Sequence, residues 1–200
     1  MATETTNLHA EVLAANAGYV ASFGDKGKLA LPPARAAAFI VCMDARINPA
    51  AAFGLAEGDA HVIRNAGGRA SDDAIRSLVI SHKLLGTKEW FVVHHTDCGM
   101  EYFKSEELAK LLETSLATAN IVPLESAPKG VTFENASAEG GSHDGHAVHW
   151  LHIDDQEASV REDVAKIVGH SLTAPGIPVH GYIYHVATGA IQHVVTQVTA

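Results

Sequence analysis

The sequence has only two cysteines in 200 residues, and it has 14 lysines and arginines against 23 aspartates and glutamates. The formal net charge of −9 and the lack of a basic cluster argue against a surface for nucleic acid or for an anionic membrane. No apolar run is long enough to span a bilayer, and the first residues lack the basic and apolar regions of a secretory signal. We therefore expect a cytoplasmic protein, in a reducing compartment, whose partners are small molecules or other protein chains.

The composition, 47% apolar and 18% charged, is ordinary for a globular protein of one domain. We expect a single domain over residues 1–200, with an N-terminal helix and connector at 1–28. Apolar residues recur at helical spacing between 7 and 23, which predicts an amphipathic first helix. The segment 120–150 is predicted to be a loop-like surface insertion, because it contains Pro123, Pro128 and several glycines.

Strand-like apolar runs alternate with helical segments along the rest of the chain. The predicted strands cover 37–41, 61–65, 89–94, 179–186 and 191–198. The predicted helices cover 49–54, 72–85, 99–119 and 156–170. This alternation predicts an α/β fold with a mainly parallel β-sheet flanked by helices, and the last two strands predict a C-terminal hairpin extension of that sheet.

Each cysteine follows one of the apolar runs. The first lies in Cys42-Met43-Asp44-Ala45-Arg46 and the second in His95-Thr96-Asp97-Cys98. For an arbitrary pair of cysteines, a disulfide or two buried thiols is the simpler interpretation. Here the strand ends favour a ligand site, and two thiolates with one imidazole form a zinc ligand set that leaves a fourth position open. A thioredoxin-like role is disfavoured, because no Cys-x-x-Cys is present.

The chain resembles the β-class carbonic anhydrases in three segments that occur in order: Cys42-Met43-Asp44-Ala45-Arg46, Arg64-Asn65-Ala66-Gly67 and His95-Thr96-Asp97-Cys98-Gly99. The resemblance implies the fold of that family and one Zn²⁺ per chain, held by Cys42, His95 and Cys98. It implies that Asp44 and Arg46 form the catalytic dyad. It also implies a homodimer or dimer-based oligomer, in which the first helix packs on a second subunit.

In this interpretation, zinc-bound hydroxide attacks the carbon of a linear triatomic substrate. Arg46 holds Asp44 off the metal, and Asp44 orients the hydroxide. If Arg46 lets go, Asp44 can instead become a fourth zinc ligand, and a protein in which it always fills that position would be noncatalytic. The sequence leaves both arrangements open.

The segment from His94 to Met100 departs from the common pattern of the family, and it looks like that of a divergent subgroup that includes carbonyl sulfide hydrolases. We expect hydrolysis of carbonyl sulfide to hydrogen sulfide and carbon dioxide, hydration of carbon dioxide to bicarbonate, or both. The alternative is an ordinary β-carbonic anhydrase with little activity on carbonyl sulfide. The predicted substrate pocket contains Met43, Gly67, Gly99 and Met100, and further apolar walls are expected from Ile47, Phe53 and Leu78.

Several other residues suggest roles near a metal. Only one of His94 and His95 can face it, because successive side chains of a strand alternate, and His94 is predicted to be a hydrogen-bonded core residue. Arg64 is predicted to form a structural salt bridge, with guidance of anions as the alternative. A run of histidines at every third position resembles a second metal site, but glycines around it predict a solvated loop with adventitious metal affinity. The run consists of His143, His146, His149 and His152.

Overall fold

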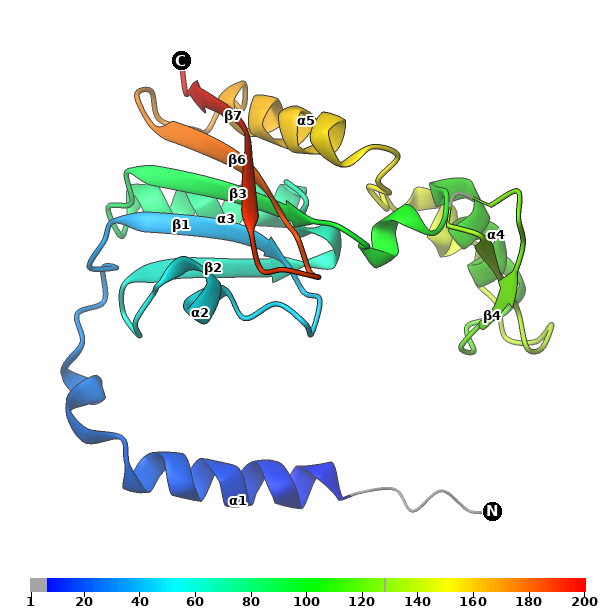
Figure 1. The fold of residues 1–200 in the computed structure, drawn as a ribbon, viewed down its shortest axis with the longest axis horizontal. Helices are drawn as coiled ribbons and strands as arrows, with labels where there is room; N and C mark the ends of the chain where they lie inside the picture. Colours follow the sequence, from blue (N-terminus) through cyan, green and yellow to red (C-terminus); the bar gives the residue numbers. More distant parts are fainter. Residues whose placement is uncertain (1–6, 128) are drawn as a thin grey trace. The chain divides into compact units, whose positions relative to one another are not determined.

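The computed structural model of the protein describes residues 7–127 and 129–200. The chain divides into two compact units, and the boundary between them lies between Leu31 and Pro32. The first unit contains the helix α1 (Leu8–Ala21) and the 3-10 helix η1 (Gly24–Lys28). The second unit contains all the other elements (Figure 1).

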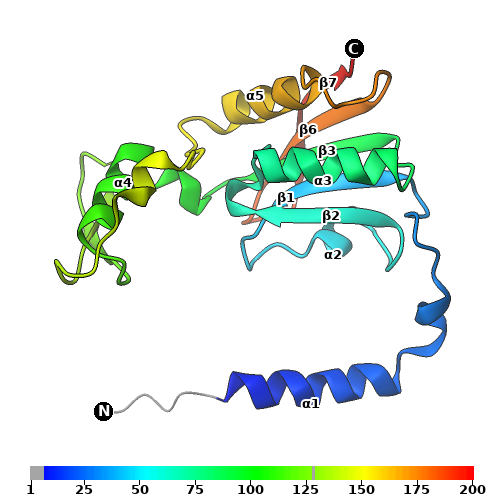
Figure 2. The same ribbon diagram turned by 180° about the vertical axis from the view of Figure 1, so that it is seen from behind.

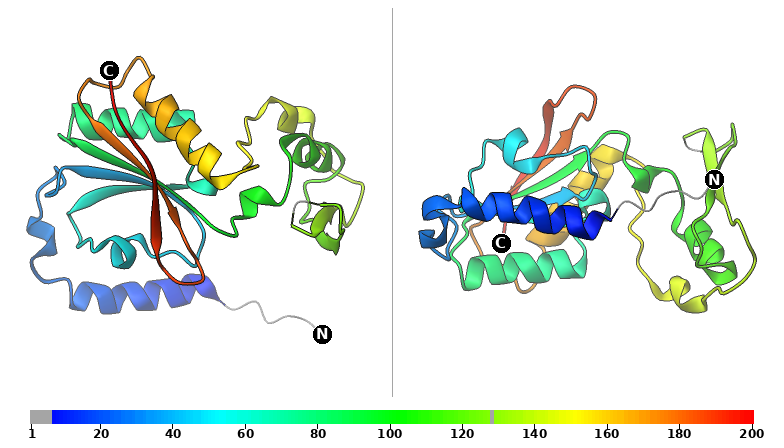
Figure 3. Two further views of the ribbon diagram at one scale, coloured as in Figure 1. Left: turned by 45° about the horizontal axis from the view of Figure 1, so that its top comes forward. Right: turned by 90° about the horizontal axis from the view of Figure 1, so that it is seen from below.

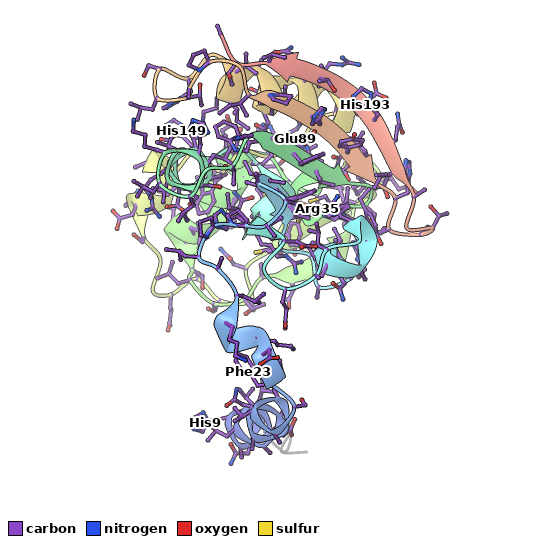
Figure 4. The ribbon with its side chains drawn as sticks, turned by 90° about the vertical axis from the view of Figure 1, so that its left-hand side faces the viewer. His9, Phe23, Arg35, Glu89, His149 and His193 are labelled. Atoms are coloured by element: carbon purple, nitrogen blue, oxygen red, sulfur yellow. The ribbon has the colours of Figure 1, made fainter. Side chains whose placement is uncertain are left out.

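The helix α1 is exposed along its whole length. It begins after Asn7, whose side chain accepts a hydrogen bond from the backbone N–H of Ala10 (3.2 Å). None of its residues is buried within the described chain, and Figure 4 shows its side chains projecting on all sides of the axis. At 100° per residue, Leu8 and Leu13 lie on different faces. The predicted amphipathic pattern is therefore wrong, because α1 is apolar over much of its circumference and not along one face.

A five-stranded sheet with the strand order β2-β1-β3-β6-β7 forms the centre of the second unit (Figures 1 and 3). Its strands are β1 (Ala37–Cys42), β2 (Ala60–Asn65), β3 (Glu89–His95), β6 (Pro178–Tyr184) and β7 (Ile191–Val198). The first four in spatial order are parallel, and β7 pairs antiparallel with β6. The predicted α/β fold, with its mainly parallel sheet and C-terminal hairpin, is confirmed.

Side chains alternate between the two faces of the sheet and divide the core in two. On one face, α3 (Asp72–Lys83) and α5 (Gln156–Val168) cover apolar residues of β1 and β3, and Figure 2 shows α3 in front of the sheet, running along the strands. On the other face, the short helix α2 (Pro49–Phe53) packs through Phe53. The first core includes Ile40, Leu78, Trp90, Val92 and Val164, and the second includes Phe39, Val41, Ile47, Val93 and Met100.

Local capping explains where α2, α3 and α5 begin. Side chains of Asn48, Ser71 and Asp155 each accept a hydrogen bond from the backbone N–H three residues later. Gly54 ends α2 in the left-handed conformation, with φ of 62°. Residues 7–127 and 129–200 include no helix that is both long and apolar enough to cross a membrane.

The predicted helix over 99–119 is wrong in extent. The chain forms a single 3-10 turn, η3 (Gly99–Glu101), and then α4 (Ser105–Thr114). Between them, Lys104 has an extended backbone with ψ of 152°, which interrupts the helical pattern. The helix ends where Ser115 takes an extended conformation and pairs with Gly140 in an isolated bridge.

The predicted loop at 120–150 also contains regular structure. The strands β4 (Asn120–Pro123) and β5 (Val131–Glu134) form an antiparallel pair, and His143–Ala147 form the 3-10 helix η4. Pro123 ends β4 without breaking it, and Gly130 has a φ of 71° where the chain turns back, so these residues shape a hairpin. Pro128 lies outside the described residues. The assignment of 120–150 as an insertion into a single domain stays a prediction.

Candidate metal centre

Parallel pairing brings the two cysteine segments together at one end of the sheet. Val41 pairs with Val93, so Cys42 at the end of β1 lies beside the last residues of β3. Gly68 fits between these strands: a Cβ atom there would lie 2.7 Å from the carbonyl oxygen of Val93 and 2.8 Å from the backbone nitrogen of Cys42. Only glycine is compatible with this approach, because no Cβ tolerates such distances.

The side chains of Cys42, His95 and Cys98 form a compact buried group. One potential ligand atom from each residue lies within 4.8 Å of the other two. The two sulfur atoms are 4.0 Å apart and both cysteines are free, whereas a disulfide requires about 2.05 Å. The disulfide alternative is therefore wrong, and the pair offers two sulfur ligands to a common point.

His95 is oriented for coordination by its backbone neighbour. Its Nδ1 donates a hydrogen bond to the carbonyl oxygen of Thr96 (2.9 Å), which leaves the lone pair on Nε2. That Nε2 is buried and has no hydrogen-bond partner among the described residues. A buried, unpaired ring nitrogen is costly unless it has a ligand, and here it lies with two thiols.

The two thiols differ in acidity because they share one hydrogen bond. The bond from Cys98 lowers the pKa of the Cys42 thiol to about 4, although burial opposes this change. The same bond, together with burial, raises the pKa of Cys98. A thiolate is thus already present at neutral pH, and a bound divalent cation would favour loss of the second proton as well.

The side chains of Asp44 and Arg46 form a two-pronged ion pair next to this group. Arg46 donates to Asp44 Oδ1 from Nε (3.0 Å) and to Oδ2 from Nη2 (2.7 Å). These bonds lower the pKa of Asp44 to about 2, so the carboxylate is ionised at neutral pH. Asp44 Oδ2 lies 3.9 Å from His95 Nε2. The carboxylate therefore borders the candidate centre while both of its oxygens are held by Arg46.

Asp97 is a contributor that the sequence interpretation missed. Its Oδ2 accepts a hydrogen bond from Arg46 Nη1 and its carbonyl oxygen accepts one from Arg46 Nη2, each at 2.8 Å. Tyr102 donates to the other carboxylate oxygen of Asp97 at 2.6 Å. The backbone of Asp97 is left-handed, with a φ of 56°, and this conformation lets its carboxylate and its carbonyl oxygen both accept hydrogen bonds from the Arg46 guanidinium. The position of Asp97 between His95 and Cys98 was the feature of the sequence that could have indicated this role.

Arg64 braces the loop that carries the dyad. It donates to the carbonyl oxygens of Cys42 (3.1 Å) and Asp44 (2.7 Å). The predicted salt bridge is wrong, since no ion pair of Arg64 occurs within residues 7–127 and 129–200. An arginine can satisfy carbonyl oxygens as well as carboxylates, because its fork carries five N–H donors.

The predicted pocket residues lie in different surroundings. Met100 is buried in the same core cluster as the two cysteines, and Met43 is 65% exposed. Gly67 has a φ of 79°, and a Cβ there would lie 3.0 Å from Cγ of Met100, so the backbone of Gly67 lies close to the Met100 side chain. Gly99 has open space around it and supports no such approach. Leu78, expected as a wall, belongs to the core on the opposite face of the sheet.

His94 faces away from this centre, as strand alternation predicts. It is fully buried, and its Nε2 donates to Asp163 Oδ2 on α5 (2.9 Å). Arg69 donates to both oxygens of that carboxylate, at 2.8 and 3.2 Å, and its side chain is 4% exposed. The predicted core role of His94 is confirmed. Sequence interpretation missed Arg69 and Asp163, although an aspartate between Val160 and Val164 on a buried helix face was a visible signal.

Known proteins resemble this chain over most of its length. The family model described as "Carbonic anhydrase" matches residues 37–191. β-Carbonic anhydrase 1 of Mycobacterium tuberculosis is 33% identical over 184 residues, which is 92% of this chain and 96% of that protein. A carbon disulfide hydrolase of Acidianus sp. is 34% identical over 155 residues, covering 74% of this chain and 72% of that protein. The solved carbonic anhydrase from Glaciozyma antarctica has a TM-score of 0.73 and 43% identity, covering 91% of this chain and 95% of that structure.

Proposed function

Because the chain belongs to the β-carbonic anhydrase family, and so to enzymes of the zinc lyase and hydrolase type, we propose that it hydrates carbon dioxide to bicarbonate. We propose that the same site hydrolyses carbonyl sulfide to hydrogen sulfide and carbon dioxide. The observation that carries the proposal is the buried group of Cys42, His95 and Cys98, bordered by the ion pair of Asp44 and Arg46.

Cys42, His95 and Cys98 are the proposed ligands of one Zn²⁺ per chain. The fit rests on the unpaired Nε2 of His95 and on two sulfur atoms 4.0 Å apart. Soft sulfur and borderline nitrogen favour zinc over magnesium or calcium, and three protein ligands leave a position open. When bound, zinc supplies a nucleophile at neutral pH by lowering the pKa of water from its bulk value to about 7.

The dyad has a positioning role in this proposal. Asp44 is ionised, so it accepts a hydrogen bond from the attacking water and aims an oxygen lone pair at the substrate carbon. Arg46 keeps both carboxylate oxygens in place, and Asp97 in turn holds Arg46. With its oxygens held in this way, Asp44 leaves the fourth position to water, which argues against a permanently closed, noncatalytic centre.

Substrate choice depends on the apolar surroundings of the centre. Ile47 and Met100 share the buried cluster of the two cysteines, and an apolar wall suits the larger, more polarizable sulfur atom of carbonyl sulfide. A pocket that distinguishes two substrates by the size of one atom changes the activation free energy by about 1–3 kcal/mol, or roughly 10–200-fold in relative rate. Activity on both substrates is therefore expected. The similar carbon disulfide hydrolases make carbon disulfide a third substrate to test.

The test is a comparison of rates on carbon dioxide, carbonyl sulfide and carbon disulfide with one zinc-loaded sample. Asp44→Asn is the matched control, because it keeps the shape of the side chain but removes the charge. We expect the unaltered protein to hydrate carbon dioxide, to release hydrogen sulfide from carbonyl sulfide, and to lose both activities in the control. A zinc-loaded protein without either activity would refute the proposed function. Rapid hydration with negligible hydrogen sulfide would refute only the sulfide branch.

We also propose that the protein is a homodimer or an assembly of dimers, with α1 covered by a second copy. The support is the exposed apolar surface of α1, where Leu8, Val12, Leu13 and Val20 are each more than half exposed. A monomeric protein rarely leaves such a surface uncovered.

A further inference from the structure

A second group of metal-ligand side chains lies on the surface of the second unit. Glu113 is in the last turn of α4, and His143 and His146 are three residues apart on η4. One ligand atom from each of the three lies within 4.8 Å of the others, and all three residues are exposed. None of them takes part in the candidate metal centre described above.

Specific packing holds η4 against the end of α4. A Cβ at Gly141 would lie 2.0 Å from the carbonyl oxygen of Glu113, so only glycine lets the loop pass there. Next along the chain, the N–H of Ser142 donates to the carbonyl oxygen of Leu112 (2.8 Å). Gly145 is buried against Leu112, where a Cβ would lie 3.1 Å from Cδ1. These glycines were expected to keep the histidines in a loop, but they allow the close approach that brings two of them to Glu113.

The three side chains already converge on one another. His146 Nε2 donates to one oxygen of Glu113 (3.0 Å), and His143 Nδ1 lies 3.4 Å from the other. The hydrogen bond from His146, with the nearby charges of the histidines and of Lys110, lowers the pKa of Glu113, so its carboxylate is ionised. The side chain of His143 is 82% exposed, so water can complete a coordination sphere from the solvent side.

We propose that Glu113, His143 and His146 form a second metal site that binds one borderline divalent ion, Zn²⁺ or Cu²⁺. Two imidazoles and one carboxylate suit these ions, whereas magnesium and calcium prefer oxygen ligands alone. Bonds to the metal replace the imidazole–carboxylate contacts, and the ion then links the end of α4 to η4. This proposal does not depend on the proposed function, because it uses other residues and its test measures binding.

The test is calorimetric titration with Zn²⁺ of protein whose cysteine centre has first been filled and freed of excess metal. We expect one further equivalent to bind. His143→Ala, His146→Ala and Glu113→Gln should each lower the affinity of that event at least about tenfold, since even residues that only support a ligand are worth 10–100-fold. The matched control is His149→Ala, which removes an exposed histidine of the same run outside the group (His149 is labelled in Figure 4).

Hydrogen exchange gives a second readout. Zinc should slow exchange of backbone amides at 112–115 and 142–147 in the unaltered protein and in His149→Ala, but not in His146→Ala. Circular dichroism of each variant without added zinc verifies that it folds. The proposal is overturned if no second equivalent binds up to millimolar zinc, if the three variants bind it as tightly as the unaltered protein, or if His149→Ala weakens it equally.

Discussion

Replacing Arg69 by methionine tests how the second unit supports its candidate centre. Arg69 follows Gly68, which packs against Cys42, and its buried guanidinium is paired with the buried carboxylate of Asp163. Two further bonds from Nη1 reach the carbonyl oxygens of Leu151 and His152. Arg69 therefore connects the turn after β2 with the middle of α5 and with the segment that precedes this helix.

The expected cost follows from burial. Methionine fills most of the volume of the arginine. Among the described residues, it leaves His94 as the remaining side-chain partner of the Asp163 carboxylate, which is itself 2% exposed. Removing one partner of a buried ion pair costs about 3–5 kcal/mol of the free energy of unfolding. For a chain of this size, such a loss lowers the midpoint of thermal unfolding by about 6–20 °C.

The measurement is urea unfolding at pH 7 and a fixed protein concentration, which keeps any subunit association comparable. Burial opposes ionisation of Asp163, but hydrogen bonds with His94 and Arg69 lower its pKa below the ordinary value. Its contribution is therefore complete above about pH 4 and lost as the pH falls further, so pH 7 reports it fully. The control is Arg76→Met, which breaks an exposed pair with Asp73 and should cost at most about 1 kcal/mol. A loss below about 1 kcal/mol for Arg69→Met would refute the reasoning.

Four further predictions concern the metal, the two residues of the dyad and the first helix. Cys98→Ala removes one of the two proposed sulfur ligands, so the zinc content should fall below about one ion per chain and activity should fall with it. Mass spectrometry of the metal measures the zinc content, and full occupancy in this variant would contradict the ligand assignment. Asp44→Asn should keep zinc but lower turnover about 100-fold or more, because the neutral amide is a weaker hydrogen-bond acceptor for the attacking water and its NH2 group would face the donors of Arg46. Arg46→Ala should lower the rate at neutral pH, because Asp44 is then free to approach the metal. An undiminished rate would show that Arg46 is not needed to hold Asp44 off the metal. Deleting the residues before Leu29 should lower the number of subunits per particle, measured by light scattering. A stable monomer of the full chain would exclude the dimer.

Local sequence determined the five strands of the main sheet, the starts of α2, α3 and α5, and the members of the candidate centre. Apolar runs of strand length define β1 and β3, and the period of two places His94 and His95 on opposite faces. Asn48 and Ser71 mark helix starts because their side chains bond to an N–H only three residues away. The meeting of Cys42 and Cys98 also follows from sequence, because parallel strands bring their carboxyl ends to one edge of the sheet.

Only the tertiary structure decided which polar groups support that centre. Arg69 and Asp163 are 94 residues apart, and Arg46 and Asp97 are 51 apart, so no local pattern pairs them. The same holds for Glu113 and His146, whose contact depends on how closely a glycine-bearing loop packs on α4. Helix and strand signals arise from neighbours within about one turn or two pleats, whereas the partner of a buried charge is whichever group packing brings within hydrogen-bond distance.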